Sequence, residues 1–493
     1  MSRREIRGIL SGVLLAMFLG ALDQTIVAPA LPTIARDLGQ FNAISWVVTA
    51  YLLSATAATA IFGKLSDLYG RRRLVMAAVS IFIVGSIGAA LAPSMLALIM
   101  ARAVQGVGGG ALMSLPNTVI GDVISPRERG RYQGYFASVY AIASIAGPVM
   151  GGFFAQFLSW TLIFWINLPL GLLAVYLSHR SLGRLPAMGR SHDIDYSGSL
   201  LMALATIALL LALTWGGHRF AWLSLQIVGL LLLALVLAAL FLARQAVARE
   251  PVLPLYLLAN PVVRNAALVG LLVVMVNISI GVYVPLFLQL QRGMTADMAG
   301  LVLIGPMIGT VGGAIVSGQY MRIIGRYKLP PLYGLAVSAA ALIALALGVD
   351  RLPMTGIVVC LVLLGIGLGT AFPTIMVATQ NAVDPADLGI ATASHQFFRS
   401  LGGALGVALF GALILGMVRS HLAAAGLDLG PEGDLTEILR QGPAARAAAP
   451  YLDGAFAAFF WGAAVAALLA AASLVLLPEI PLRHHAAANA PAE

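Results

Sequence analysis

Charged residues are scarce in this chain. Asp, Glu, Lys and Arg make up 10% of its 493 residues, whereas a soluble domain carries roughly 25%. Hydrophobic residues make up 60% of the chain, and its mean hydropathy is +0.95. This shortage of polar surface excludes a soluble globular monomer, because lipid must cover much of the outside. The composition therefore predicts a polytopic membrane protein.

The residues that build metal and nucleotide sites are also few or badly spaced. The single cysteine, Cys360, lies in an apolar run, which excludes an intramolecular disulfide. The seven histidines and this cysteine show no metal-ligand spacing, and there is no phosphate-binding loop ending in Lys-Ser or Lys-Thr. The glycine run at residues 106–110 lies within an apolar stretch and is interpreted as helix packing. We expect no enzyme activity, no cofactor, no metal and no direct use of ATP.

Long apolar runs are what the sequence has in abundance. A helix needs about 20 such residues to cross the hydrocarbon core, and fourteen runs qualify. They lie near residues 8–30, 43–65, 73–92, 95–120, 132–155, 160–179, 197–216, 222–243, 265–290, 298–321, 330–349, 353–381, 388–416 and 452–477. The first run follows three arginines, as in a signal peptide, but it has no convincing cleavage site and is interpreted as an uncleaved helix. The prediction is an all-α polytopic membrane protein.

The positive charges are distributed unevenly between the two sides of these predicted spans. The net charge is +9, but it lies in short clusters between apolar runs, which argues against a nucleic-acid-binding face. With the N-terminus inside, the inner segments hold 21 of the 29 Lys and Arg residues and the outer loops hold 7. The positive-inside rule then places both termini in the cytoplasm. We expect a multi-pass protein of the plasma membrane, the inner membrane of a bacterium.

The chain also repeats itself. Gly63 and Gly70 align with Gly318 and Gly325 at an offset of 255 residues, and Gly106 aligns with Gly365 at an offset of 259. A nearly common shift predicts two six-helix halves of like topology, with two helices inserted between them. The predicted division is an N-terminal six-helix bundle at 1–190, two inserted helices at 191–250, a C-terminal six-helix bundle at 251–480 and a tail at 481–493.

Four segments carry recognisable motifs: residues 22–32 (LDQTIVAPALP), 63–73 (GKLSDLYGRRR), 98–106 (LIMARAVQG), and Gly134 followed by 147–152 (GPVMGG). They resemble the helix-1, helix-2/3-loop, helix-4 and helix-5 motifs of the major facilitator superfamily. With the helix count, the resemblance is to its fourteen-helix drug/proton antiporter branch. One departure is Ala143, where the helix-5 motif usually has a second glycine; a small residue still stands there.

The resemblance implies the major facilitator fold and export of small amphipathic or cationic compounds, as in multidrug efflux, in exchange for protons by alternating access. The expected partners are protons, a small-molecule substrate and the lipid bilayer, with no nucleic acid, and we expect a monomer. One alternative within transport is an exporter of a specific endogenous metabolite or lipid. An alternative from another class is a channel or a transporter-derived receptor.

Asp23 and Arg102 are interpreted as the proton-coupling pair. Asp23 is the one carboxylate deep within a predicted span, and Arg102 is interpreted as the one deep cation. An ionisable group at that depth costs about 2.5 kcal/mol or more, so it normally pairs or serves transport. Asp23 lies about 22 Å from the inner end of its span and Arg102 about 10 Å from the outer end of its own, which puts them at similar depth. The alternative is a static ion pair.

Two motifs are interpreted as the conformational switch. One is the loop with Gly63, Asp67, Gly70, Arg71 and Arg72, which in the family helps to latch the two halves on the cytoplasmic side. The alternative is a plain turn with positive-inside arginines. The other comprises Gly147, Pro148, Gly151 and Gly152, which the family associates with export. Its alternative is close helix packing through small residues.

Other polar or aromatic residues within spans are predicted to line a central cavity, although each could instead bond to a neighbouring helix. They are Gln24, Tyr51, Gln105, Asn277, Gln289, Gln380, His395 and Gln396. The outer segment at residues 419–452 is rich in Gly, Pro and acids. We expect it to be a mobile element over the external opening, with a passive linker as the alternative.

Overall fold

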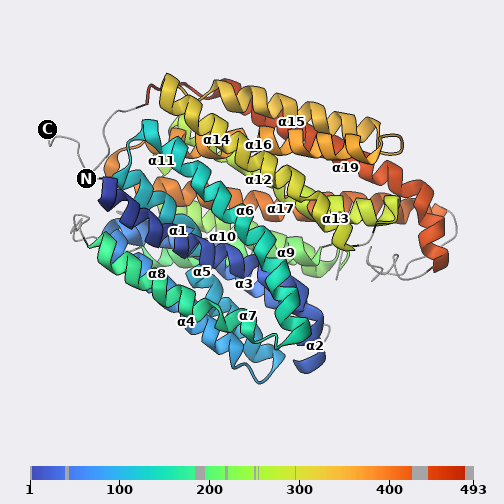
Figure 1. Cartoon of the computed structure of the whole chain (residues 1–493), viewed down its shortest axis with the longest axis horizontal. Helices are drawn as coiled ribbons and strands as arrows, with labels where there is room; N and C mark the ends of the chain where they lie inside the picture. Colours follow the sequence, from blue (N-terminus) through green and yellow to red (C-terminus); the bar gives the residue numbers. More distant parts are fainter. Residues whose placement is uncertain are drawn as a thin grey trace.

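The computed structural model shows a bundle of long helices (Figure 1). It describes residues 3–38, 44–183, 195–216, 220–248, 251, 253, 255–294, 296–424 and 442–482. Within these residues, thirteen helices are long and apolar enough to cross a membrane. A further apolar helix, α9 (Tyr196–Trp215), is shorter in its described apolar stretch, Ser197–Leu213. The predicted all-α polytopic fold is confirmed, and each predicted apolar run corresponds to a helix.

The first set of helices, here called the N-terminal set, packs around its own apolar core. Its members are α1 (Arg3–Ile26), α3 (Ile44–Tyr69), α4 (Arg71–Ala90), α5 (Met95–Val123), α6 (Pro126–Phe157) and the pair α7 (Leu162–Trp165) and α8 (Asn167–Leu182). The short helix α2 (Leu31–Leu38) follows α1. Within each helix the backbone satisfies its own hydrogen bonds, as a lipid environment requires.

The second set, here called the C-terminal set, has a separate buried cluster. Its members are α12 (Pro261–Arg292), α13 (Ala296–Val302) with α14 (Ile304–Ile324), α15 (Leu329–Leu347), α16 (Met354–Asn381), α17 (Leu388–Ala424) and α19 (Gly442–Leu476), preceded by the short α11 (Leu255–Ala259). The helices α17 and α19 extend into the predicted outer segment at 419–452, which is therefore shorter than expected. The remainder of that segment, residues 425–441, lies outside the described residues, and its role as a lid stays a prediction.

The same glycine packing recurs in both sets. In the N-terminal set, Gly106 of α5 lies against the backbone at Tyr51 of α3. In the C-terminal set, Gly365 of α16 lies against the backbone at Pro306 of α14. The two glycines are 259 residues apart, and their partners are 255 residues apart. The repeat seen in the sequence thus corresponds to a repeated helix contact, because only a glycine lets two backbones approach so closely.

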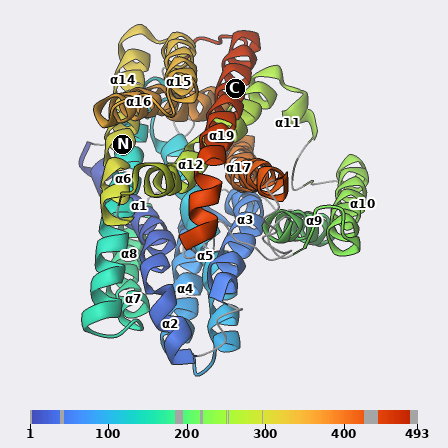
Figure 2. The same cartoon turned by 90° about the vertical axis from the view of Figure 1, so that its right-hand side faces the viewer.

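The helices α9 and α10 (Leu225–Val247) form a pair at the side of the bundle (Figure 2). Asp195 joins the two at one end, because its carboxylate caps Gly198 N at 3.0 Å and accepts from Arg244 Nε at 3.0 Å. Burial raises the pKa of Asp195, but the hydrogen bonds from Gly198, Arg244 and Ser197 outweigh this effect, and the pKa is lower than usual. At the other end, the ring centroids of Trp215 and Trp46 of α3 are 5.6 Å apart.

The described chain begins and ends at one end of the bundle, here called the terminal face, and the opposite end is the distal face. Near its start Gly8 packs on Ser181 of α8, and near its end the Pro481 carbonyl accepts from Asn381 Nδ2 at 3.2 Å. Figure 1 shows the two sets close together at the terminal face and spread apart at the distal face.

Candidate functional site: a buried ion pair and the contacts between helix sets

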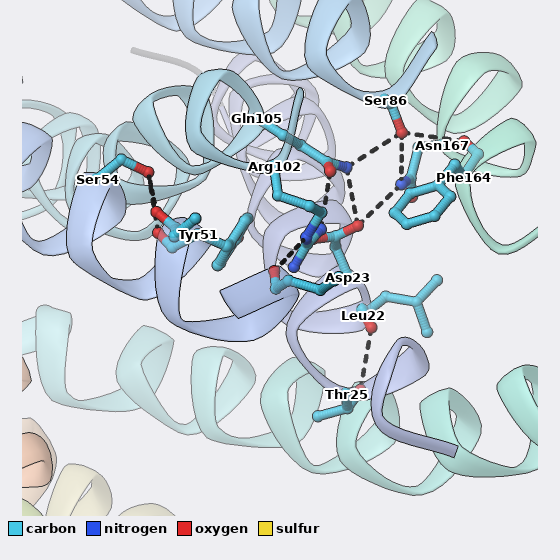
Figure 3. A network of polar contacts seen from close by, with 12 residues as sticks. Leu22, Asp23, Thr25, Tyr51, Ser54, Ser86, Arg102, Gln105, Phe164 and Asn167 are labelled. Carbon is cyan, nitrogen blue, oxygen red and sulfur yellow. Dashed lines mark hydrogen bonds and ion pairs between the residues drawn. The ribbon is translucent and has the colours of Figure 1, made fainter. Parts of the chain in front are cut away.

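Asp23 and Arg102 form an ion pair inside the N-terminal set (Figure 3). The Nη1 atom of Arg102 lies 2.6 Å from Oδ2 of Asp23. Asp23 lies on α1, and Arg102 lies two turns into α5, whose first turn is capped by Ser94. Their side chains are 0% and 1% exposed, respectively. The helices therefore bring together the two residues that the sequence singled out.

Three further polar side chains complete the surroundings of the carboxylate. Its Oδ1 atom accepts from Gln105 Nε2 at 2.8 Å and from Asn167 Nδ2 at 3.1 Å. Both amides also reach Ser86 of α4, at 3.1 Å and 2.9 Å, and the Ser86 hydroxyl donates to the Phe164 carbonyl (Figure 3). Residues from α1, α4, α5 and α8 thus hold one carboxylate in a closed hydrogen-bond network.

The guanidinium of Arg102 has further partners besides Asp23. Its Nε donates to the Val47 carbonyl at 3.2 Å, and its Nη1 also donates to Gln105 Oε1 at 2.7 Å. The Arg102 Cζ atom lies 4.3 Å from the ring centroid of Tyr51 and 5.7 Å from that of Phe164, which is within cation–π range. A buried ion pair is tolerated when its remaining donors and acceptors are satisfied. In this conformation the pair is sealed from solvent.

The helix-1 and helix-5 motifs pack on each other beside this pair. The Thr25 hydroxyl of α1 donates to the Ala143 carbonyl of α6 at 2.9 Å. A side chain on Gly147 would meet Thr25, and one on Gly151 would meet the Ile26 carbonyl. Because Pro148 also removes one backbone donor within α6, the helix can bend here. The predicted switch residues of this motif therefore lie directly against the helix that carries Asp23.

The loop between α3 and α4 is fixed by a second buried ion pair. Gly70 has a φ of +87°, which suits glycine at this turn. Arg71 Nε lies 2.7 Å from Asp122 Oδ2 of α5, and its Nη1 donates to Ser66 at 2.6 Å. Arg72 instead contacts His179 of α8, with ring nitrogens at 2.9 and 3.1 Å. The side chain of Asp67 is not among those described.

The two sets meet through α3, α5 and α6 on one side and α14, α16 and α17 on the other. Arg129 of α6 donates to Gln380 Oε1 of α16 at 3.3 Å, and Gln380 Nε2 donates to the Asn117 carbonyl of α5 at 3.0 Å. Close by, Gly63 of α3 lies against Ala393 of α17, so a larger residue there would separate the sets. These contacts lie at the terminal face and hold it closed.

Comparison with known proteins assigns the family. The sequence model described as Major Facilitator Superfamily matches residues 13–407, more than half of the chain. The chain belongs to the major facilitator superfamily. It is therefore a secondary transporter and not an enzyme, as the motifs predict.

Relatives of this transporter include drug exporters. The Multidrug transporter protein MdtP of Bacillus subtilis (strain 168) is 36% identical over 409 residues, which cover 82% of this chain and 75% of that protein. Multidrug resistance protein 3 of the same organism is 31% identical over 403 residues, which cover 82% of this chain and 78% of that protein. The efflux pump dotC of Dothistroma septosporum is 33% identical over 405 residues, which cover 81% of this chain and 69% of that protein.

Solved structures of other transporters share the fold. The proton:xylose symporter XylE matches with a TM-score of 0.65 at 14% identity, covering 97% of both chains. A bacterial homologue of the iron transporter ferroportin, in an outward-facing state, matches with a TM-score of 0.63 at 13% identity, covering 96% of this chain and 99% of its own. At such identities the likeness shows the fold alone, and it agrees with the predicted major facilitator fold.

The residues predicted to line the cavity of this transporter divide into two groups. Gln24, Asn277, Gln289 and Gln396 are partly exposed. Tyr51, Gln105, Gln380 and His395 are at most 2% exposed. The structure places Tyr51 and Gln105 in the Asp23 network and Gln380 in the contact between the sets, because each bonds or packs across to a neighbouring helix. In this conformation these three do not line an open cavity.

Sequence reasoning missed several residues of this transporter. Asn167 contacts Asp23, and Ser86 contacts Asn167. The sequence feature that could have identified both is a polar side chain inside an apolar run.

The interpretation of Arg102 as the one deep cation is wrong. Arg399 was counted in an inner segment, but it lies 11 residues into α17, about 16 Å from its start. Moving it into the span leaves 20 inner against 7 outer positive charges, so the bias persists.

Proposed function

We propose that this transporter exports small amphipathic or cationic compounds from the cell in exchange for protons, from a plasma-membrane location with the terminal face in the cytoplasm. The observation that carries the proposal is the sealed Asp23–Arg102 pair, a carboxylate at membrane depth with a cation 2.6 Å away. Relatives named as multidrug transporters support export of varied compounds. The positive-inside charge bias supports the orientation.

The pair has the properties that proton exchange needs. An ionised carboxylate attracts the Arg102 cation, and a protonated carboxyl does not. Gain or loss of a proton at Asp23 would therefore weaken or restore its contact with Arg102. Arg102 keeps the Val47 carbonyl and Gln105 Oε1 as acceptors after Asp23 is protonated. The guanidinium of Arg102 would therefore still have two acceptors when the ion pair opens.

Alternating access supplies the second half of the mechanism. The Arg129–Gln380 contact closes the terminal face in this conformation, while the sets diverge toward the distal face (Figure 1). With the terminal face in the cytoplasm, this is the outward-facing state. Proton entry from outside would loosen the ion pair beside α6, and rocking of the two sets would then expose the site to the cytoplasm.

Purified protein in proteoliposomes tests the function. A pH gradient should drive uphill transport of fluorescent amphipathic and cationic dyes, with saturation, and an uncoupler should abolish it. Each translocated dye should be accompanied by a counterflow of protons, measured with a pH-sensitive dye. Transport that ignores the gradient would contradict the proposal. A response to one compound out of the panel would favour the exporter of a specific metabolite instead.

A further inference from the structure

Arg399 lies in the middle of the transporter, between the two helix sets. Its guanidinium carbon is 4.9 Å from the ring centroid of Phe372 on α16. Its side-chain stem packs on α12 at Gly270, where a Cβ atom would lie 3.2 Å from Arg399 Cγ. Across the boundary between the sets, Tyr140 of α6 lies near it and is itself 37% exposed. Arg399 is partly exposed as well. A ligand between the sets could therefore reach the guanidinium.

Arg399 differs from Arg102 in having no carboxylate partner among the residues that the structure describes. Its Nη1 atom donates to Gln396 Oε1 at 3.2 Å, and its Nε atom has no hydrogen-bond partner in the described part of the chain. One turn earlier on α17, His395 is 2% exposed, and neither of its ring nitrogens is hydrogen-bonded to any described group. Two adjacent side chains thus offer hydrogen-bonding atoms that the described protein does not use.

The described deep carboxylate cannot compensate this charge. Asp23 is 0% exposed and already shared among Arg102, Gln105 and Asn167. The Asp23–Arg102 pair is neutral as a unit, which leaves Arg399 as a net positive charge at membrane depth. An uncompensated charge there is costly and usually marks a substrate pathway. A planar guanidinium also matches a carboxylate with two parallel hydrogen bonds.

We propose that Arg399 is the binding site for the carboxylate of an amphipathic aromatic substrate, whose ring packs between Phe372 and Tyr140. The proposal rests on the proposed export function and concerns its amphipathic substrates: among these, the site would favour compounds that carry an anionic group. The competing interpretation is that Arg399 merely stacks on Phe372 to hold α16 and α17 together. That interpretation gives no preference for an anionic ligand.

Two probes with the same aromatic body separate these interpretations. Dansylglycine carries a carboxylate that is ionised at pH 7, and dansylglycine amide is its neutral counterpart. Fluorescence titration of the protein in nanodiscs, without a pH gradient, should give a Kd at least tenfold lower for the acid than for the amide. In Arg399→Gln this preference should fall to about one, and in Arg399→Lys it should be reduced but retained. Arg244→Gln, at a 46% exposed side chain on α10 that pairs with Asp195, should keep the full preference.

A wild-type protein that binds both probes equally would overturn the proposal, as would a folded Arg399→Gln variant that keeps the preference. Should that variant fail to fold, labelling of the wild type decides. Phenylglyoxal should modify Arg399, as seen by peptide mass spectrometry, and dansylglycine should protect it at least fivefold while the amide should not. Equal protection by both would contradict carboxylate binding. Since neither measurement uses a gradient, failure of proton-driven export would leave a positive binding result standing.

Discussion

The Nη1 atom of Arg102 lies 2.6 Å from Oδ2 of Asp23, although the two residues are 79 positions apart in the chain. Both side chains are buried, Oδ1 of Asp23 also accepts from Gln105 Nε2, and Nε of Arg102 donates to the Val47 carbonyl. Breaking such a pair by removing one partner is expensive, typically about 3–5 kcal/mol, because it leaves a charge uncompensated. The pair therefore ties α1 to α5 inside the N-terminal set.

Asp23→Asn should abolish export driven by a pH gradient. Asparagine keeps the size of the side chain and one of its two acceptor oxygens but cannot exchange a proton, so uphill accumulation in everted vesicles should fall at least tenfold. Asp23→Glu should retain part of the activity, because it keeps a titrating group at a shifted position. Asp37→Asn, at an exposed position on α2, is the matched control and should transport normally. Uphill export by Asp23→Asn would show that the proton site lies elsewhere.

Arg102→Gln should move the pH dependence of transport instead of abolishing transport. An adjacent cation favours the ionised form of a carboxylate, so its removal favours the protonated form. The transport rate plotted against pH should therefore shift toward higher pH in the variant. The measurement is the initial transport rate in proteoliposomes at a series of equal internal and external pH values. An unchanged profile would favour a static, purely structural ion pair.

Gln380→Ala should weaken closure of the terminal face. The substitution removes the acceptor of Arg129 and the donor to the Asn117 carbonyl, both of which connect the sets. In a Cys360→Ser background, a cysteine at Ser394, now 4% exposed, should be labelled by a maleimide at least threefold faster when Gln380 is changed.

Gln289→Ala is the control for this experiment, because the Gln289 side chain donates to the Pro285 carbonyl of its own helix. It should leave the labelling rate unchanged. Equal rates in the two glutamine variants would mean that Gln380 does not hold the face closed.

Asp195→Asn should destabilise the α9–α10 pair at neutral pH. The lowered pKa of Asp195 means that its ionised form stabilises the folded protein at pH values above the ordinary aspartate pKa. That stabilisation, about 1–2 kcal/mol for a cap with a charged partner, is lost as the pH falls through the lowered pKa. Thermal unfolding in detergent should therefore separate the variant from the wild type at pH 7 and less so near pH 3. Asp350→Asn, in a half-exposed pair with Arg351, should show no such difference.

Topology reporters should place both chain ends in the cytoplasm. Fusions after Glu493 and within residues 180–192 should be cytoplasmic, and one near Gly430 should be external, because positive charge concentrates on the inner segments. A reporter of known sidedness on a separate protein controls for lysis. A cytoplasmic result near Gly430 would be incompatible with fourteen crossings.

The sequence alone determined the membrane class, the positions of the apolar helices and the family of this protein, because these depend on local features. Hydropathy along the chain located the helices, and the four motifs predicted the fold that the comparisons confirmed. Helix rise alone placed Asp23 and Arg102 at similar depth. The division into two bundles with an inserted pair, and the cytoplasmic orientation of the ends, stay predictions.

Only the tertiary structure decided which side chains meet. Depth along a helix does not specify the rotation of that helix, so Asn167 and Ser86 could not be assigned to the Asp23 network in advance. The Arg129–Gln380 bond joins residues 251 positions apart in the chain, and no local sequence pattern predicts that these two side chains meet. The surroundings of Arg399 could also be seen only in the tertiary structure. Among the described residues no carboxylate pairs with it, and this depends on how α6, α12 and α16 pack around α17.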